Sequence, residues 1–268
     1  MIDDLTPVQK VENYYVKRDD LFEIYGVKGG KARSCYQLIL DGISKGYKTF
    51  VTAGSRKSPQ CELVSTICEN LNVKCILFMP TGEETSVIKN INKNKNSTII
   101  RTPCGYNNVI ISRAKKYAEQ NSYTYYIPFG MEFRQNIDIT KHQVKNIPPE
   151  VKRVVVPVGS GMSFCSIAIG LIENKRTDIE MVGVRVGKDP KKIIDKYLGF
   201  YLQYLKKKGL CFNIKMLQSK YKYDNEVSAK IGDIVLDPIY EAKCKEFLQD
   251  GDLLWCVGKR KKGANKND

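Results

Sequence analysis

The stretch VKRVVVPVGSGMSFCSIAIGLIENK, residues 151–175, contains the transition on which the fold depends. Its first part is an apolar run that ends in the turn Gly159-Ser160-Gly161, and such a run is typical of a strand buried on both faces. The residues from Met162 onward are predicted to form a helix. A buried strand that passes through a tight turn into a helix is the repeating unit of a parallel sheet.

The same alternation recurs along most of the chain. Strands are expected at 14–18, 48–54, 74–80, 97–103, 123–130, 151–161, 179–187 and 252–258. Helices are expected at 32–46, 58–72, 83–94, 107–121, 162–175 and 237–249. This order predicts an α/β protein of two domains, each an open and mostly parallel sheet with helices on both faces. Ligands of such sheets bind beyond the carboxyl ends of the strands.

The composition is that of a globular protein. The chain has 268 residues, of which 42% are hydrophobic, and no apolar run reaches the roughly 18 residues of a membrane-spanning helix. Its start, MIDDLTPVQK, is too acidic and polar for a secretory signal. The nine cysteines form no CxxC pair, so we expect neither a zinc site nor a disulfide framework, but reduced, buried thiols in the cytoplasm.

A single histidine, His142, restricts the catalytic chemistry. Metal sites built from several histidines are excluded, and a histidine-based nucleophilic triad would depend on this one residue in a polar stretch. General acid–base catalysis is therefore expected from Lys, Asp, Glu, Tyr or Ser side chains.

The formal net charge is +15, with a pI near 9.3. This charge has two alternative interpretations. It can attract a nucleic acid or an anionic substrate, or it can reflect a general richness in lysine and asparagine, because the lysines are spread along the chain. The last residues, GKRKKGANKND at 258–268, are typical of a basic disordered tail.

The glycine turn at 159–161 is a candidate phosphate site. Gly159 and Gly161 allow close approach of the backbone, and the helix that follows supplies free N–H groups from Met162 and Ser163. Ser160 and Ser163 add hydroxyl donors. The spacing matches neither GxGxxG nor GxxxxGK[ST], and a purely structural tight turn is the alternative.

Three other short stretches carry polar groups at element ends. TAGSRKSPQ, at 52–60, offers serines at a strand end and a helix start, which suits a substrate carboxylate or a simple N-cap. GDIVLDPIYEAK, at 232–243, is in isolation typical of a well-capped helix. VKGGKARS, at 27–34, places Lys31 behind two glycines, either as a buried amine or at an ordinary turn.

Together these stretches resemble the fold-type-II enzymes that use pyridoxal phosphate, and within them the aminocyclopropane-carboxylate deaminase and D-cysteine desulfhydrase family. The likeness runs in the same order over residues 14–257. It comprises a lysine segment, a serine loop, an Ile-Pro-x-Gly segment, a cofactor-phosphate turn and a Leu-Asp-Pro-Val-Tyr-x-Gly-Lys segment. Here these are YVKRDDLFEIYGVKGGKARSCYQLI (15–39), TAGSRKSPQ (52–60), YYIPFG (125–130), VGSGMS (158–163) and DIVLDPIYEAKCKEFLQDGDLLWCVG (233–258).

The resemblance implies a role for each candidate. Lys31 would carry the Schiff base to the cofactor aldehyde, its pKa lowered by burial and a cationic neighbourhood, and the glycines would let the cofactor approach it. The turn residues Gly159, Ser160, Gly161, Met162 and Ser163 would hold the phosphate. Glu241 would face the pyridine nitrogen and keep it protonated, and Tyr240 would be a nearby acid or base.

On the substrate side, the resemblance implies that Ser58 lies near the substrate carboxylate as a catalytic residue. Ser55 and Gln60 would bind substrate with it. The family's asparagine that bonds the cofactor 3′-oxygen is replaced by Pro59, which has no side-chain donor. The fourth residue of the phosphate turn is Met162 instead of glycine, and the segment before the last strand is shortened, so the substrate side is the more altered.

These inferences combine into one architecture and three functional hypotheses. A large cofactor-binding domain is expected from residues 1–35 and 129–257, with a smaller inserted domain at 36–128 and the cofactor between them. The first hypothesis is a pyridoxal-phosphate enzyme that acts at the α-carbon of an amino acid, as a deaminase or lyase, and related enzymes are commonly homodimers. The second is the same chemistry on an amino acid or amine attached to a nucleic acid, as in DNA base modification. The third is a non-catalytic binding protein on the same fold.

Overall fold

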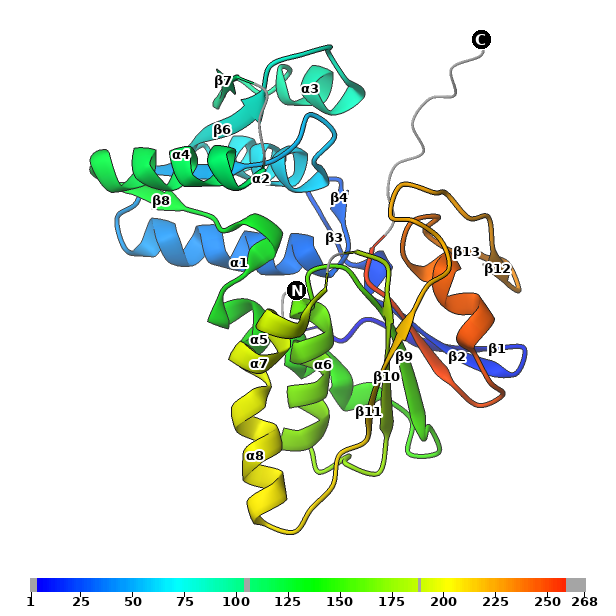
Figure 1. Ribbon diagram of the computed structural model, residues 1–268. Helices are drawn as coiled ribbons and strands as arrows, with labels where there is room; N and C mark the ends of the chain where they lie inside the picture. Colours follow the sequence, from blue (N-terminus) through cyan, green and yellow to red (C-terminus); the bar gives the residue numbers. More distant parts are fainter. Residues whose placement is uncertain (1–3, 104–106, 188, 259–268) are drawn as a thin grey trace. The chain divides into compact units, whose positions relative to one another are not determined.

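The computed structural model describes residues 4–103, 107–187 and 189–258 (Figure 1). The chain divides into two compact units, each described here by itself. The large unit contains residues 1–22, 28–31 and 134–259, and the small unit contains residues 23–27 and 32–133. The domain boundaries expected from the sequence, at 36 and 128, stay a prediction. The expected tail lies outside the described residues from position 259 onward.

The large unit is built on a six-stranded sheet with the strand order β1-β2-β14-β9-β10-β11. Only the edge pair of β1 and β2 is antiparallel, and the other neighbours are parallel. The strands are β1 (Val8–Val11), β2 (Tyr14–Arg18), β9 (Arg153–Val158), β10 (Glu180–Arg185), β11 (Ile214–Gln218) and β14 (Leu253–Cys256). Short strands β12 (Lys230–Ile231) and β13 (Ile234–Val235) form a separate hairpin.

Successive residues of the central strands point to opposite faces, and both faces are covered. Along β9, Val154, Val156 and Val158 lie in one apolar cluster with the helices, whereas Val155 lies in a second cluster with Ala242. The helices of the first face are α5 (Arg134–Lys141), α6 (Met162–Glu173), α7 (Lys191–Tyr197) and α8 (Gly199–Lys207), with the 3-10 helix η3 (His142–Asn146). The second face is covered by the 3-10 helix η4 (Glu241–Phe247), and a further 3-10 turn, η1 (Asp19–Leu21), follows β2.

The small unit contains a parallel four-stranded sheet with the order β7-β6-β5-β8. Its strands are β5 (Thr49–Ala53), β6 (Lys74–Pro80), β7 (Ser97–Thr102) and β8 (Thr124–Tyr126). Phe78 of β6 packs in the cluster that contains Ile110 of α4, whereas Cys75 of β6 lies against Cys68 of α2 on the other face. The remaining elements are α1 (Gly30–Ser44), α2 (Pro59–Asn70), α3 (Ser86–Ile91), α4 (Asn107–Gln120), η2 (Phe129–Met131), β3 (Glu23–Ile24) and β4 (Val27–Lys28).

These sheets confirm the predicted fold class, but the structure differs from the expectation at two places. The helix expected at 237–249 is present only as the 3-10 helix η4 and starts later than expected, because the Asp237 carboxylate accepts the N–H groups of Ile239 and Tyr240 and turns the chain before η4 begins. Helices α7 and α8 were not expected, although KKIIDKYLGFYLQYLKKK at 191–208 carries paired apolar residues at helical spacing.

The cysteines differ from the expectation at one position. All of the cysteines in the described chain are free, and burial raises the pKa of the Cys61 and Cys165 thiols to about 12, which makes them unreactive. Cys211 is exposed instead of buried, because it lies in the loop that follows α8. Cys104 lies outside the described residues.

Within the described residues, no helix combines the length and the apolar character that crossing a membrane requires.

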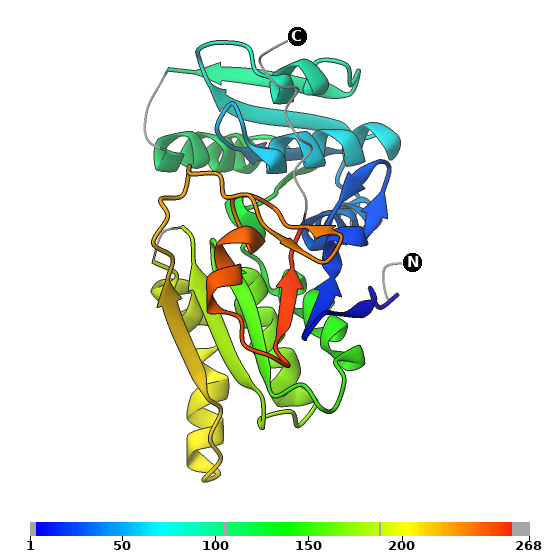
Figure 2. The same ribbon diagram turned by 90° about the vertical axis from the view of Figure 1, so that its right-hand side faces the viewer.

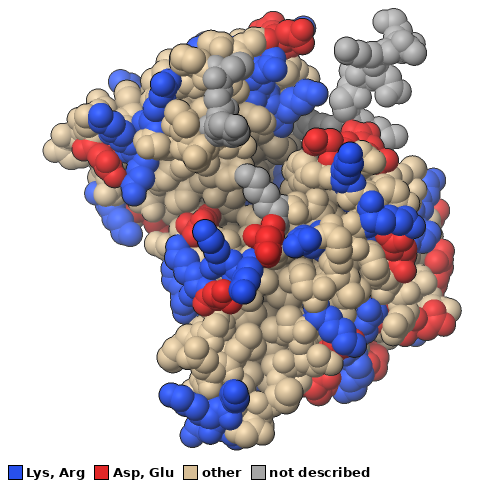
Figure 3. Space-filling view, in the orientation of Figure 1, with Lys and Arg blue, Asp and Glu red and all other residues tan. Residues whose placement is uncertain are grey.

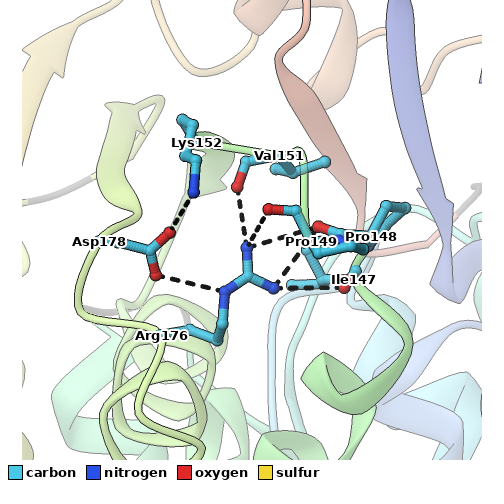
Figure 4. Close-up of polar contacts among 7 residues, drawn as sticks. All are labelled: Ile147, Pro148, Pro149, Val151, Lys152, Arg176 and Asp178. Atoms are coloured by element: carbon cyan, nitrogen blue, oxygen red, sulfur yellow. Dashed lines mark hydrogen bonds and ion pairs between the residues drawn. The ribbon is translucent and has the colours of Figure 1, made fainter.

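One arginine fixes the amino end of β9 (Figure 4). The Arg176 guanidinium donates hydrogen bonds to a fan of backbone carbonyls in the segment before that strand, and its Nε donates to Asp178 at 3.3 Å. The carbonyls belong to Ile147, Pro148, Pro149 and Val151, at distances between 2.9 and 3.5 Å. The carbonyls lie between η3 and β9, in a segment that belongs to no helix or strand, so the arginine supplies donors that regular secondary structure does not provide there.

We predict that Arg176→Lys lowers the free energy of unfolding by about 1–3 kcal/mol, because a lysine ammonium cannot reproduce the planar fan of donors. The measurement is urea unfolding followed by the fluorescence of Trp255, the single tryptophan, which is fully buried in the large unit. Arg101→Lys is the control, since Arg101 is exposed and makes one long bond, 3.4 Å, to the Pro80 carbonyl. Equal losses in the two variants would contradict the role given to Arg176.

Candidate functional site

The candidate cofactor residues of the large unit lie around the carboxyl edge of its parallel sheet. Strands β2, β14, β9 and β10 all run in the same direction, so the segments that follow them leave the sheet at the same edge (Figure 2). These segments begin with Asp19, Val257, Gly159 and Val186. This edge is where ligands of open α/β sheets bind.

The turn after β9 has the geometry of an anion site. Gly161 adopts a left-handed φ of +97° as the N-cap of α6 and has no side chain to cap the helix, and the Met162 N–H makes only a long bond, 3.5 Å, to the Ser160 hydroxyl. The first intrahelical bond runs from Cys165 N–H to the Gly161 carbonyl, at 2.9 Å. The backbone N–H groups of the first turn, including Ser163, therefore point out of the helix without an intrahelical acceptor. Together with the exposed Ser160 hydroxyl, they can hold a phosphate.

Glu241 is the most unusual ionisable group at this edge. Its side chain is 1% exposed, and Oε1 accepts the Val257 N–H at 2.6 Å. Its other oxygen, Oε2, is buried and has no hydrogen-bond partner among the described residues. Burial, and then the nearby charge of Asp237, raise the pKa of this carboxyl well above its usual value. Such an orphaned oxygen fits a ligand that brings its own hydrogen-bond donor.

Tyr240, beside Glu241, packs directly on the phosphate turn. A Cβ atom at Gly159 would lie 3.1 Å from the Tyr240 ring, so a side chain there would push the ring by a few tenths of an ångström. The Tyr240 backbone N–H donates to the Asp237 carboxylate at 3.0 Å. Its hydroxyl lies 3.1 Å from the Tyr223 hydroxyl. The turn after β9 and the segment before η4 are therefore in contact.

The glycines before Lys31 serve the chain's own backbone. Gly29 has a φ of +95°, and a Cβ atom there would lie 2.9 Å from the Gly258 Cα and from the Val257 carbonyl oxygen. Gly30 N–H donates to that carbonyl at 3.1 Å. The expected reason for the glycines was approach of a cofactor, but what the structure places against Gly29 is the segment after β14.

Lys31 itself departs from the expectation of a buried amine, which is wrong for the chain alone. Its side chain is exposed, because it extends from the first turn of α1 next to two residues without side chains. The backbone just before Lys31 is nevertheless held by a hydrogen bond to Val257. The Gly30 N–H donates to the Val257 carbonyl, and the Val257 N–H donates to Glu241, so the backbone of Val257 joins the lysine segment to the buried carboxylate.

The serine loop of the small unit is described separately. Ser58 is buried and caps α2, since its hydroxyl oxygen accepts the Cys61 N–H at 3.4 Å, and Pro59 is the exposed first residue of that helix. Ser55 is exposed. The Gln60 amide is occupied by the chain itself: it donates to the Thr52 hydroxyl and the Pro128 carbonyl and accepts the Gly130 N–H. This network joins the end of β5 to the segment after β8.

Sequence reasoning missed three contributors at the sheet edge. They are the Val257 peptide, the Tyr223 hydroxyl and the buried Lys243, whose Nζ donates to the Lys222 and Tyr223 carbonyls. No composition signal marks a backbone bridge such as Val257. The lysine falls at the end of the Leu-Asp-Pro-Val-Tyr-x-Gly-Lys likeness, which was the available signal for it. Among the described residues, no group of three or more histidine, cysteine or acidic side chains could hold a metal ion.

We predict a characteristic pH dependence for Glu241→Gln in the cofactor-free protein. An unfolded glutamate titrates near 4.5, and the native carboxyl titrates well above that value, so the native state holds an extra proton between the two pKa values. The wild-type free energy of unfolding therefore falls as pH rises above the unfolded pKa. Gln cannot ionise, so the free energy of unfolding of the variant should rise relative to that of the wild type as the pH increases above the unfolded pKa of 4.5.

The measurement is urea unfolding at several pH values, again with Trp255 fluorescence. Glu226→Gln is the control, since Glu226 is exposed. It should change little with pH relative to the wild type. Parallel stability curves for Glu241→Gln and the wild type would show that the buried carboxyl carries no such penalty.

Comparison with known proteins identifies the family of the chain. The family model described as "Pyridoxal-phosphate dependent enzyme" matches residues 3–197. A D-cysteine desulfhydrase of Yersinia pestis (strain Pestoides F) is 22% identical over 290 aligned positions, which cover 94% of this chain and 87% of that protein.

Two solved structures have a similar fold. A structure described as an ACC deaminase homologue has a TM-score of 0.76 and 21% identity, covering 95% of this chain and 89% of its own. A hydrogen sulfide-producing enzyme from Fusobacterium nucleatum has a TM-score of 0.65 and 15% identity, with 97% of each chain covered. The family match spans most of the chain, and the fold agrees with it. The chain therefore belongs to the pyridoxal-phosphate-dependent enzyme family.

Proposed function

We propose that this enzyme acts at the α-carbon of a small amino acid, as a deaminase or lyase, and that Lys31 is the residue that binds pyridoxal phosphate covalently as a Schiff base. The observation that carries the proposal is the buried Glu241 oxygen without a partner among the described residues, joined through Val257 to the segment that presents Lys31. The names of the similar proteins, a D-cysteine desulfhydrase and an ACC deaminase homologue, support this substrate class.

The residues at the sheet edge fit the cofactor. The first-turn N–H groups of α6 and the hydroxyls of Ser160 and Ser163 would hold its phosphate, and Glu241 Oε2 would face its ring nitrogen. When bound, pyridoxal phosphate withdraws electrons from the α-carbon of the amino acid that it carries. Burial raises the pKa of the Glu241 carboxyl, so this side chain would be suited to share a proton with a ring nitrogen that faces it.

Proton transfer would be divided between two side chains. The Lys31 side chain is exposed and follows two residues without side chains, Gly29 and Gly30, so its amine can act as a nucleophile and then as a base. Tyr240 is held on both sides, by Gly159 beneath its ring and by Tyr223 at its hydroxyl, which suits a group that gives or takes a proton at a fixed place.

For the substrate carboxylate, we propose the start of α2. The Ser58 oxygen accepts the Cys61 N–H, and its hydroxyl also makes a side-chain hydrogen bond with the Cys61 thiol, which its hydrogen would leave to meet a carboxylate. Ser55 lies one turn away in an exposed position. Gln60 is the weakest of the three candidates, because its amide already makes three bonds within the chain. Pro59 offers no donor at all, so any contact with the cofactor 3′-oxygen must come from another residue.

A second candidate is the same chemistry on an amino acid or amine attached to a nucleic acid. The observation that favours it is the net charge of +15. Figure 3 weakens it, because on the face shown the lysines and arginines of the described residues are interspersed with acidic side chains instead of forming one continuous patch. We keep the free amino acid as the preferred substrate.

The proposal has two further parts. The enzyme would be a homodimer, as the resemblance implies, and it would be located in the cytoplasm.

Borohydride reduction tests the role of Lys31. The protein loaded with pyridoxal phosphate should be yellow, and after reduction, peptide mass mapping should find the cofactor on Lys31 alone. Lys31→Arg should abolish the label, because a guanidinium does not form this linkage, whereas Lys28→Arg, the neighbouring exposed lysine, should keep it. A colourless protein, or a label on another lysine, would overturn the assignment.

A panel of D- and L-amino acids, free and nucleotide-linked, identifies the substrate class. We expect a free small amino acid to change the absorbance of the loaded enzyme and to release ammonia or another small product. Changes with the nucleotide-linked compounds alone would select the second candidate. No change with any compound would refute both.

A further inference from the structure

The segment 219–227 follows the edge strand β11 and crosses to η4 without forming a helix or strand (Figure 2). Its side chains are mostly exposed, yet its backbone is tied at both ends. Tyr221 N–H donates to the Ser219 hydroxyl at 3.2 Å, and Val227 N–H donates to the Pro238 carbonyl at 2.9 Å. The middle of the segment, where Tyr223 lies, depends on a different residue.

That residue is Lys243, which is fully buried in η4. Its Nζ donates to the Lys222 carbonyl at 2.7 Å and to the Tyr223 carbonyl at 2.9 Å. Bonds from a charged donor inside a protein are short and strong. Removing them would take the ammonium away from both carbonyls, and the Lys222 carbonyl would keep only the bond from the Asn225 N–H, at 3.2 Å, within the described part of the chain. A buried ammonium is also costly, so its retention at this place indicates a positional role.

The fixed backbone sets the position of the Tyr223 side chain. Although Tyr223 is 42% exposed, its ring meets Tyr240 edge to face, with centroids 6.2 Å apart and planes at 82°. The two hydroxyls are 3.1 Å apart. Tyr240 lies against Gly159 on its other side, so Tyr223 decides where the Tyr240 hydroxyl can point.

We propose that Lys243 is a positioning residue for the site: by holding the carbonyls of Lys222 and Tyr223, it fixes the Tyr223 hydroxyl against that of Tyr240. The importance of Tyr240 rests on the proposed function. The placement of its hydroxyl does not, so the test uses cofactor-free protein, and failure of the borohydride experiment would leave its result unchanged.

The experiment places 3-fluorotyrosine at position 240 and follows its fluorine resonance, which reports on the hydrogen bond of the phenol. Tyr223→Phe should shift the resonance, because it removes the neighbouring hydroxyl. Lys243→Met should shift it in the same direction. The double variant should shift no further than Tyr223→Phe alone, because both changes act through one contact. Lys245→Met should have no effect, since that lysine lies in the same helix but binds the Lys230 carbonyl, outside the segment.

An unshifted resonance in folded Lys243→Met, or shifts that simply add in the double variant, would overturn the proposal. Trp255 fluorescence reports whether each variant is folded. If Lys243→Met does not fold, hydrogen exchange of the wild-type protein decides. Slow exchange of the Asn225 N–H, which donates to the Lys222 carbonyl at 3.2 Å, supports a fixed segment, and exchange at the rate of an unstructured peptide refutes it.

Discussion

The candidate site depends on the backbone of one residue, Val257, at the end of β14. Val257 donates its N–H to Glu241 and accepts the Gly30 N–H at its carbonyl oxygen. Both bonds lie at the edge where the parallel strands end, so the sheet itself holds the peptide in place. Val257 therefore fixes the positions of two distant segments, the one before β14 that carries the Glu241 carboxylate and the N-terminal one that carries Lys31. Gly29 makes this possible, because any side chain there would collide with the backbone of Val257 and Gly258.

The buried ionisable groups of the large unit differ in how completely they are satisfied. Lys17 and Lys243 are both fully buried, and each donates to two oxygens, at distances between 2.7 and 2.9 Å. Glu241 is satisfied at one oxygen only, within the described part of the chain. Because folding favours satisfied buried groups, an unsatisfied oxygen beside a phosphate-type turn is more informative about function than the two well-bonded lysines. The two lysines hold segments of the chain through their hydrogen bonds, whereas the second oxygen of Glu241 can accept a hydrogen bond from a ligand.

How far the sequence predicted the site can be judged residue by residue. The turn at 159–161 was recognisable, because glycines between an apolar strand and a helix are typical of a tight turn that a ligand can approach closely. Lys31 was singled out, but its burial was predicted wrongly, since exposure depends on neighbours that are distant in sequence. Gln60 looked like a binding residue, and only the fold shows that its amide joins β5 to the segment after β8. The Tyr223 and Lys243 contacts could not be predicted, because they join a segment without periodic pattern to a 3-10 helix.

The sequence by itself determined the alternating strands and helices, the phosphate-type turn and the family likeness, because each of these is written in local spacing and in the order of short motifs. The tertiary structure alone decided which groups meet at the sheet edge: the Gly30 N–H with the Val257 carbonyl, and the Val257 N–H with the Glu241 carboxylate. It also decided that Tyr223 meets Tyr240. The physical reason is that strand order and register, not proximity along the chain, determine which loops are neighbours. A hydrogen bond between peptide groups leaves no trace in the identity of the residues that make it.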